Sequence, residues 1–280
     1  MKTSSKLLLG GAVGAALGTY LLSLRGRTGN PALPKLQNHL YAHRGYYRHP
    51  DIPENSIPAF RRALERGWGA EFDVHLLRDG TLAVLHDSDL LRMTGVEGKI
   101  EDLNLAELTQ LRLLGTQERI PTFNQVLALF DGRVPLIIEL KSANGNHAAL
   151  AEAVCKRLDR YEGVFCLESF DPRVLNEVKK LRPDFCRGQL ARNFFRDPFG
   201  LTKAQQLLGT NLSFNFLTRP DFVAYCFQER KQPANLLSKN LWGIQNIGWT
   251  IRTPEELRQC RKEGIIPIFE GFDPEAENEN

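Results

Sequence analysis

Short apolar runs alternate with amphipathic stretches along most of the chain after Asn38. Apolar runs of strand length that lie between turn-forming residues predict β-strands. The strands predicted in this way cover Leu40–His43, Ala70–His75, Leu136–Leu140, Val164–Glu168, Phe185–Leu190, Leu212–Asn215, Ile247–Ile251 and Ile265–Phe269.

Helices are predicted between most of these strands, because apolar residues recur there at helical spacing. The predicted helices cover Ser56–Arg66, Thr122–Phe130, His147–Arg160, Pro172–Leu181, Pro220–Arg230 and Thr253–Glu263. The last of these has the strongest start, with a Thr cap, Pro at the first position and two acids in the first turn.

The alternation of strands and helices predicts parallel βαβ units and an α/β fold. The roughly 245 residues after residue 35 match the usual size of a closed (β/α)8 TIM barrel of about 250 residues. A doubly wound open sheet is the alternative. The chain has no GxGxxG or Walker-type loop, which argues against a nucleotide-binding version of that alternative.

The alternation breaks between His86 and Thr122. This segment is too long for an ordinary connection between a strand and a helix, so we expect a small insertion over residues 88–121, after the second strand. The tail over residues 273–280 is acidic and poor in apolar residues, which predicts disorder.

An uncharged apolar run, Leu7–Leu24, precedes the predicted barrel. As a helix it would be roughly 27 Å long, close to the thickness of a bilayer core. The residues before Arg25 offer no good signal-peptidase site, which favours an uncleaved transmembrane helix over a cleaved signal peptide. We therefore expect a single-pass membrane anchor and linker over residues 1–35 and a barrel domain over residues 36–272.

The side of the membrane on which the barrel lies stays open. Basic residues flank the apolar run at both ends, so the positive-inside rule gives no preference. The 5 Cys are odd in number and have no zinc-site spacing, which predicts buried, reduced thiols and mildly favours a cytoplasmic barrel.

The net charge of +3 belongs to the N-terminal segment. Residues 1–35 hold five basic residues and no acid, which leaves 31 basic and 33 acidic residues in the remainder. A nearly neutral barrel has no electrostatic footprint for nucleic acid, so we expect no such partner.

Carboxylates are concentrated near the ends of two predicted strands. Glu71 and Asp73 are two positions apart, so both project from one face of a strand. Glu139 and Lys141 have the same spacing after another apolar run. Active sites of such barrels lie at the C-terminal ends of the strands. Three carboxylates without thiolates or a histidine cluster suit Ca²⁺ or Mg²⁺, although solvated acids at strand ends would give the same pattern.

Two histidines also lie at predicted strand ends, His43 and His86. Imidazoles that titrate near neutrality can serve as general acid and base. Arg44 can bind a phosphate oxygen, and Gly45 permits close backbone approach. Glu54 and Asn55 precede the first predicted helix, either as part of a capping turn or to orient neighbouring groups.

Together these motifs resemble the glycerophosphodiester phosphodiesterase family. The resemblance covers roughly residues 40 to 272, and it is specific because five motifs occur in the family's order. They are His43-Arg44-Gly45, Pro53-Glu54-Asn55-Ser56, Glu71-Phe72-Asp73, His86-Asp87 and Glu139-Leu140-Lys141, followed by Ser169-Phe170 and Trp249-Thr250. The segment after His86 matches the family's small insertion.

The resemblance implies a barrel enzyme that hydrolyses glycerophosphodiesters to sn-glycerol 3-phosphate and an alcohol. It implies a divalent cation held by Glu71, Asp73 and Glu139, and a general acid/base pair formed by His43 and His86. Attack by the substrate's own glycerol hydroxyl is the expected route.

The resemblance also implies roles for the surrounding residues. Arg44 and Lys141 would bind the phosphate, Glu54 and Asn55 would support the site, and Trp249 would pack on glycerol. Trp249 as an ordinary core residue is nearly as good an interpretation.

One position departs from the family. Many members end the last strand with an Asp, and this chain has Glu270 there, which we expect to support the site in its place. Two alternatives stay open: a lysophospholipase D-like activity, and a catalytically silent barrel that binds ligands at a membrane. The second would predict loss of a histidine or carboxylate, and none is lost.

Overall fold

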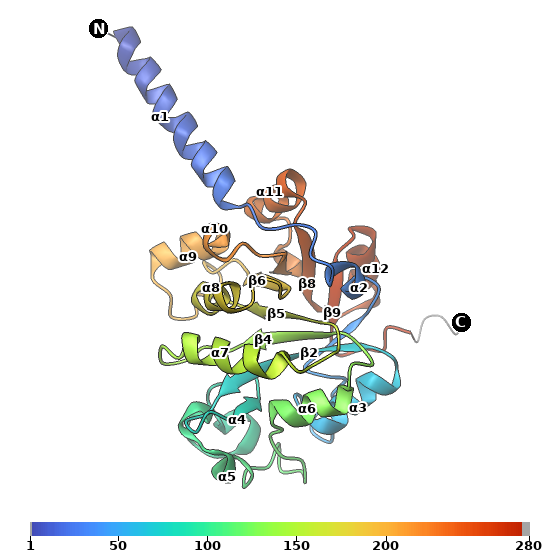
Figure 1. Ribbon diagram of the computed structural model, residues 1–280. Helices are drawn as coiled ribbons and strands as arrows, with labels where there is room; N and C mark the ends of the chain where they lie inside the picture. The colour runs from blue at the N-terminus through green and yellow to red at the C-terminus, as the bar shows by residue number, and fades with distance from the viewer. Residues whose placement is uncertain (1, 276–280) are drawn as a thin grey trace.

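Eight parallel strands close into a barrel in the computed structural model (Figure 1). The structure describes residues 2–275, with side chains from Val13 onward. The strands follow the order β1-β9-β8-β7-β6-β5-β4-β2, and β1 pairs with β2 to close the ring. They are β1 Tyr41–His43, β2 Gly69–Leu76, β4 Leu136–Leu140, β5 Phe165–Ser169, β6 Arg187–Ala191, β7 Phe222–Cys226, β8 Gln245–Ile251 and β9 Ile266–Phe269. The predicted barrel is confirmed.

Helices surround the barrel and follow most of its strands (Figure 1). The longer ones are α3 Ile57–Glu65, α6 Phe123–Phe130, α7 His147–Leu158, α8 Pro172–Leu181, α9 Lys203–Thr210, α11 Pro233–Trp242 and α12 Pro254–Lys262. Short turns of helix lie at α2 Leu33–Leu36, α10 Asn215–Thr218 and η2 Phe227–Glu229. The predicted cap of the last helix is present, because the Thr253 side chain accepts a hydrogen bond from the Glu256 backbone.

The sequence pattern predicted the sixth barrel strand at the wrong place. The segment predicted as a strand, Leu212–Asn215, lies in the turn after α9 and ends on the first residue of α10. The strand is Phe222–Cys226, which lies inside the predicted helix Pro220–Arg230. Its residues are buried on both faces, so they show neither a strand nor a helix period. Pro220, the first residue of that predicted helix, precedes the strand by two positions.

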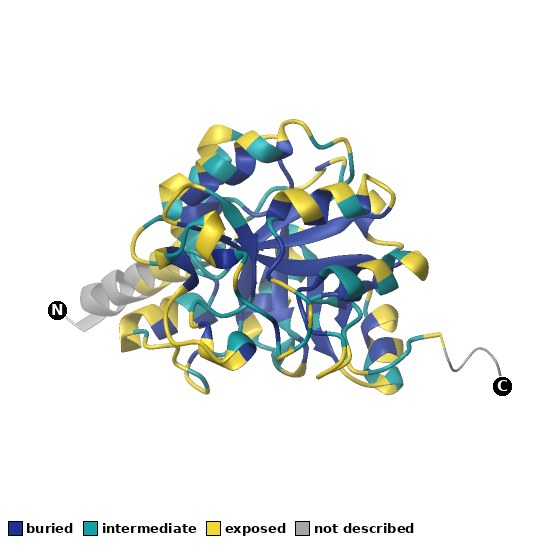
Figure 2. Cartoon of the chain, turned by 90° about the horizontal axis from the view of Figure 1, so that it is seen from below, coloured by how far each residue is buried: buried dark blue, intermediate teal, exposed yellow. Residues whose placement is uncertain are grey.

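The core has two layers, one between strands and helices and one inside the barrel. The outer layer contains Phe72, Phe123 and Phe130, and the inner layer contains Tyr41 and Ile137. Figure 2 shows buried strands surrounded by helices whose outer faces are exposed. Strand alternation therefore sends every second side chain to the interior, where the polar residues near the strand ends meet.

The expected insertion forms a small lobe beside β2. The strand β3, Leu82–Val84, pairs antiparallel with β2 just before residues 88–121, and α4 Leu91–Thr94, η1 Ile100–Asp102 and α5 Leu105–Leu108 lie within them. The lobe has its own apolar cluster, which includes Leu85, Met93, Ile100 and Leu108.

The N-terminal helix α1, Lys2–Ser23, extends from the barrel (Figure 1). Across the part of the chain whose side chains are described, no helix is long and apolar enough to cross a membrane. The prediction of a transmembrane helix over Leu7–Leu24 is therefore not supported, and the side chains of its first six residues lie outside the described part.

The end of the apolar run packs against protein. Leu24 is fully buried in a cluster with Val223 and Ile244. The Leu21 carbonyl accepts a hydrogen bond of 2.9 Å from Trp242 Nε1. Further along, α2 joins the apolar cluster inside the barrel. The segment from Leu21 to Leu36 therefore packs against the barrel and its helices.

The first residues of the acidic tail also contact the barrel. Arg66 pairs with Asp273 at 2.9 Å, and Trp68 Nε1 donates to Glu275 at 3.1 Å. The remaining predicted disordered residues, 276–280, lie outside the described part. All five cysteines, which are described, are free thiols, and four are buried, which confirms that prediction.

An ion pair fastens the N-terminal segment to the barrel and predicts a stability effect. Arg27 Nε and Nη2 each lie 2.7 Å from an oxygen of Asp221, which is 1% exposed. Removal of Arg27 leaves that buried carboxylate short of a partner. We expect Arg27→Ala to lower the free energy of unfolding by about 2 kcal/mol, measured by urea denaturation.

Arg25→Ala provides the matched control. Arg25 lies over the Trp242 ring and is exposed, so we expect a loss below about 1 kcal/mol. Equal losses for the two variants would contradict the importance of the Arg27–Asp221 pair.

Candidate active site

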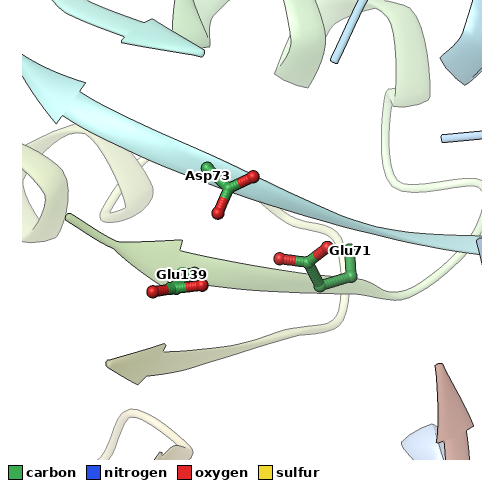
Figure 3. Close-up of side chains that lie close together, drawn as sticks. All are labelled: Glu71, Asp73 and Glu139. Atoms are coloured by element: carbon green, nitrogen blue, oxygen red, sulfur yellow. The ribbon is translucent and has the colours of Figure 1, made fainter. Parts of the chain in front are cut away.

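Three carboxylates converge at one end of the barrel (Figure 3). Glu71 and Asp73 come from β2, and Glu139 comes from β4, where it is the register partner of Asp73. One oxygen of each lies within 4.8 Å of the others, and all three residues are buried. The i, i+2 spacing directs Glu71 and Asp73 inward, while Phe72 between them joins the outer core.

Two cationic side chains approach this carboxylate cluster. Lys141 Nζ lies 3.0 Å from Asp73 Oδ1 and 2.9 Å from Glu139 Oε1. Arg44 donates its backbone N–H to Glu71 at 3.2 Å, and its Nε lies 3.8 Å from Asp73. Two cations therefore face three carboxylates, and part of the negative charge is left without a partner.

The unequal surroundings separate the pKa values of the three acids. Burial and repulsion from Asp73 raise the pKa of Glu71 well above its usual value. Burial also raises the pKa of Glu139 to about 7, against the attraction of Lys141. Asp73 is buried too, but Lys141, His86 and Arg44 hold its pKa below the usual range. A bound divalent cation would relieve this repulsion, and the all-oxygen donor set suits Ca²⁺ or Mg²⁺.

His43 is held in a defined orientation beside the cluster. Its Nδ1 lies 2.5 Å from Glu270 Oε2, so Nδ1–H donates to that carboxylate, and Nε2 lies 3.8 Å from Glu71. Burial lowers the pKa of the imidazole, and its bond to Glu270 partly opposes this. The ring is therefore neutral near pH 7, with Nε2 free to accept a proton.

Glu270 follows the last residue of β9 and contacts His43 directly. Its carboxylate also accepts from Tyr47 Oη at 3.1 Å and pairs with Arg252 at 2.5 Å. Burial opposes its ionisation, but the bonds to His43 and Arg252 lower its pKa to about 2. The longer Glu side chain at this position reaches the histidine directly.

His86 follows β3 and borders the cluster on the side of the insertion. Its Nδ1 lies 2.6 Å from Asp87 Oδ1, and Asp87 in turn pairs with Arg92. Burial lowers the pKa of His86, while Asp73 raises it. His86 also lines a cavity of about 640 Å³, together with Glu139 and Lys141.

Glu54 and Asn55 join the N-terminal turn of α3 to the site. Asn55 donates to Asp73 Oδ2 at 2.9 Å from a left-handed backbone, φ 54°. Glu54 lies 2.8 Å from Arg44 and 2.7 Å from Arg92, and although burial opposes its ionisation, these two cations lower its pKa to about 2. The structure thus brings both residues to the site's second layer of contacts.

Trp249 lies near the cavity but is fixed within the protein. Its indole N–H donates to the Ala224 carbonyl at 3.1 Å, and its ring stands edge-on to Phe170, with 5.6 Å between centroids. Phe170, Phe194 and Phe199 form an aromatic wall of the cavity. The geometry therefore shows packing of Trp249, and its contact with glycerol stays a prediction.

Comparison with known proteins agrees with this geometry. Residues 43–272 match the model of the glycerophosphoryl diester phosphodiesterase family, and this range contains every residue of the site described above. The chain belongs to this family. The expectation that the chain is a phosphodiesterase is confirmed. The alternative of a catalytically silent binding barrel is not favoured.

Individual family members resemble the chain over most of its length. A glycerophosphodiester phosphodiesterase of Caldanaerobacter subterraneus is 31% identical over 247 residues, 84% of this chain and 94% of that protein. A Thermotoga maritima glycerophosphodiester phosphodiesterase superposes with a TM-score of 0.63 at 26% identity, over 82% of this chain and 93% of that one.

A more distant structure shares the fold. An Oleispira antarctica phosphodiesterase, solved with its product sn-glycerol-3-phosphate, has a TM-score of 0.70 at 23% identity, over 86% of this chain and 95% of that one.

Several residues of the site had no signal in the sequence. Arg92, His49, Tyr47 and Arg252 lie in loops or short turns and reach the site only through the fold. Glu168 is the register partner of Glu139 on β5, fully buried, and burial raises its pKa well above the usual value. The one sequence signal for Glu168 is its position at the end of an apolar run predicted as a strand.

The pKa values of the cluster predict that cation binding depends on pH. A cation must displace the protons held by Glu71 and Glu139, and the pKa of Glu139 is raised to about 7. We expect the affinity for Ca²⁺ or Mg²⁺ to rise from about pH 5 to about pH 8 and then to level off, measured by isothermal titration calorimetry. Asp73→Asn should remove this binding. An affinity that is the same across this pH range would contradict the assignment.

Proposed function

We propose that the chain hydrolyses glycerophosphodiesters to sn-glycerol 3-phosphate and an alcohol, with the help of a divalent cation. The observation that supports this most strongly is the carboxylate cluster with a histidine on either flank, since His43 borders Glu71 and His86 lies near Asp73. The family membership supports the same reaction.

The residues present fit a hard cation. The cluster offers oxygen ligands from Glu71, Asp73 and Glu139. The pKa is raised for Glu71 and Glu139 and lowered for Asp73, because Lys141 and Arg44 balance the negative charge of the cluster only in part. When bound, the cation supplies Lewis-acid stabilisation of negative charge on the phosphoryl oxygens. Lys141 and Arg44 lie close enough to the cluster to bind those oxygens as well.

His43 is the better candidate for the general base. Glu270 fixes its Nδ1–H, which leaves Nε2 unprotonated, an arrangement that resembles the base-orienting pairs of other hydrolases. In the first step His43 takes the proton of the substrate's glycerol hydroxyl, and the hydroxyl oxygen forms a bond to phosphorus. The phosphorus–oxygen bond to the alcohol then breaks.

His86 is the better candidate for the general acid. It lines the cavity where the leaving alcohol has room, and as the imidazolium, with its Nδ1–H held by Asp87, it donates its Nε2 proton to this alcohol. Water then opens the resulting cyclic phosphate, with the proton transfers reversed, and sn-glycerol 3-phosphate leaves.

The cavity also provides the one observation in favour of the lysophospholipase D-like alternative. Its aromatic wall of Phe170, Phe194 and Phe199 gives apolar surface for a long-chain leaving group. Rates on glycerophosphocholine and lysophosphatidylcholine separate the two activities. A higher kcat/KM for the lysolipid would make the alternative the main activity.

The histidine roles predict a large loss of turnover in single variants. We expect His43→Ala and His86→Ala each to lower kcat for glycerophosphocholine by about 10²–10⁴-fold, because each removes one proton-transfer group. The measurement is a coupled assay of glycerol 3-phosphate release, with folding checked by circular dichroism.

His39→Ala is the control, because His39 lies just before β1, at the opposite end of the strand from His43. It should leave kcat unchanged. Folded His43 or His86 variants with wild-type turnover would show that the proton transfers were assigned to the wrong residues.

A further inference from the structure

A buried chain of hydrogen bonds connects the insertion to the backbone of His86. His75, on β2, lies with Nδ1 2.6 Å from Glu101 Oε1 and with Nε2 3.4 Å from the His86 carbonyl oxygen. Glu101, in η1 of the insertion, accepts on its other oxygen a bond of 2.5 Å from Ser88 Oγ. The chain thus begins and ends on the segment that carries His86.

The two central residues of this hydrogen-bond chain are buried, and they line the same cavity as His86. His75 is 2% exposed and Glu101 is 8% exposed. Each ring nitrogen of His75 faces an oxygen atom, one of the Glu101 carboxylate and one of the His86 carbonyl. Removal of either residue leaves the other with a buried polar group that has lost its partner.

The backbone around His86 needs such support because β3 ends before it. The strand stops at Val84, and the Leu85 N–H still donates to the Asp73 carbonyl at 3.2 Å. Beyond that point the His86 carbonyl is held by His75, and the imidazole is oriented by Asp87. Backbone and ring of His86 are therefore fixed by separate contacts.

We propose that His75 and Glu101 are positioning residues that hold His86 in place for proton transfer. This inference rests on the function proposed above. It gives the insertion a part in catalysis, because η1 supplies the carboxylate that fixes the His75 ring. His75 lies on β2, two residues after Asp73, on the strand that also carries Glu71. The hydrogen bonds of His75 therefore couple the position of His86 to the strand that bears the carboxylate cluster.

Kinetics of His75→Leu, Glu101→Ala and the double variant test this role, with Ser88→Ala as the milder variant in case the others do not fold. We expect each single variant to lower kcat about tenfold or more with KM within about twofold, since a small displacement of a proton-transfer group slows the chemical step. The double variant should be no worse than the singles, because both residues act through one chain. Glu101→Gln keeps an acceptor for His75 and should restore kcat to within about threefold of wild type.

Leu108→Ala is the matched control, since Leu108 is buried in the insertion's apolar cluster and outside the chain. It should lower the melting temperature and leave kcat unchanged. Two results would overturn the positioning role. One is a Leu108→Ala variant whose kcat falls as much as that of Glu101→Ala at a similar loss of melting temperature. The other is a double variant whose fold-loss of kcat equals the product of the fold-losses of the two single variants.

The ring resonances of His86 give a readout that does not depend on activity. In protein with ¹⁵N-labelled histidine, assigned with His86→Gln, these resonances should shift in Glu101→Ala and stay in place in Leu108→Ala. Unchanged resonances in Glu101→Ala would overturn the inference. Wild-type protein without activity on any glycerophosphodiester would instead refute the proposed function, and the resonances would still decide the positioning role.

Discussion

The repulsion among Glu71, Asp73 and Glu139 is the constraint around which this end of the barrel is built. Buried carboxylates at such close range cannot all stay ionised unless positive charge surrounds them. Lys141 and Arg44 supply part of that charge, which is why Asp73 has a lowered pKa while the pKa of Glu71 and of Glu139 is raised. The remaining imbalance suits the cluster to a divalent cation, which is the role proposed for it above.

The barrel supplies the rigidity that this arrangement needs. The parallel register of β2 and β4 sets Asp73 opposite Glu139, and the ends of β1 and β9 set His43 against Glu270. On the other side His86 is held by its neighbour Asp87 and by His75 on β2, whose ring Glu101 of the insertion fixes. The groups on the two flanks of the cluster are thus fixed by different elements, each with its own packing.

Most of the barrel and the acids of its site could be predicted from the sequence, because both depend on local signals. Strand periodicity and i, i+2 spacing already place Glu71 and Asp73 on one face. The strand Phe222–Cys226 was missed because burial on both faces removes any period. The partners of the histidines were harder to foresee, since contacts such as Arg252 with Glu270 join residues from different loops and strand ends. The packing of Leu24 on the barrel likewise depends on tertiary contacts and not on apolar length.

The most direct test of the account is ³¹P NMR of glycerophosphocholine incubated with the purified chain, with Mg²⁺ or Ca²⁺ and then with excess EDTA. We expect the diester resonance to be replaced by that of glycerol 3-phosphate when a cation is present, and we expect EDTA to stop this conversion. Equal conversion with EDTA, or no conversion with either cation, would contradict it.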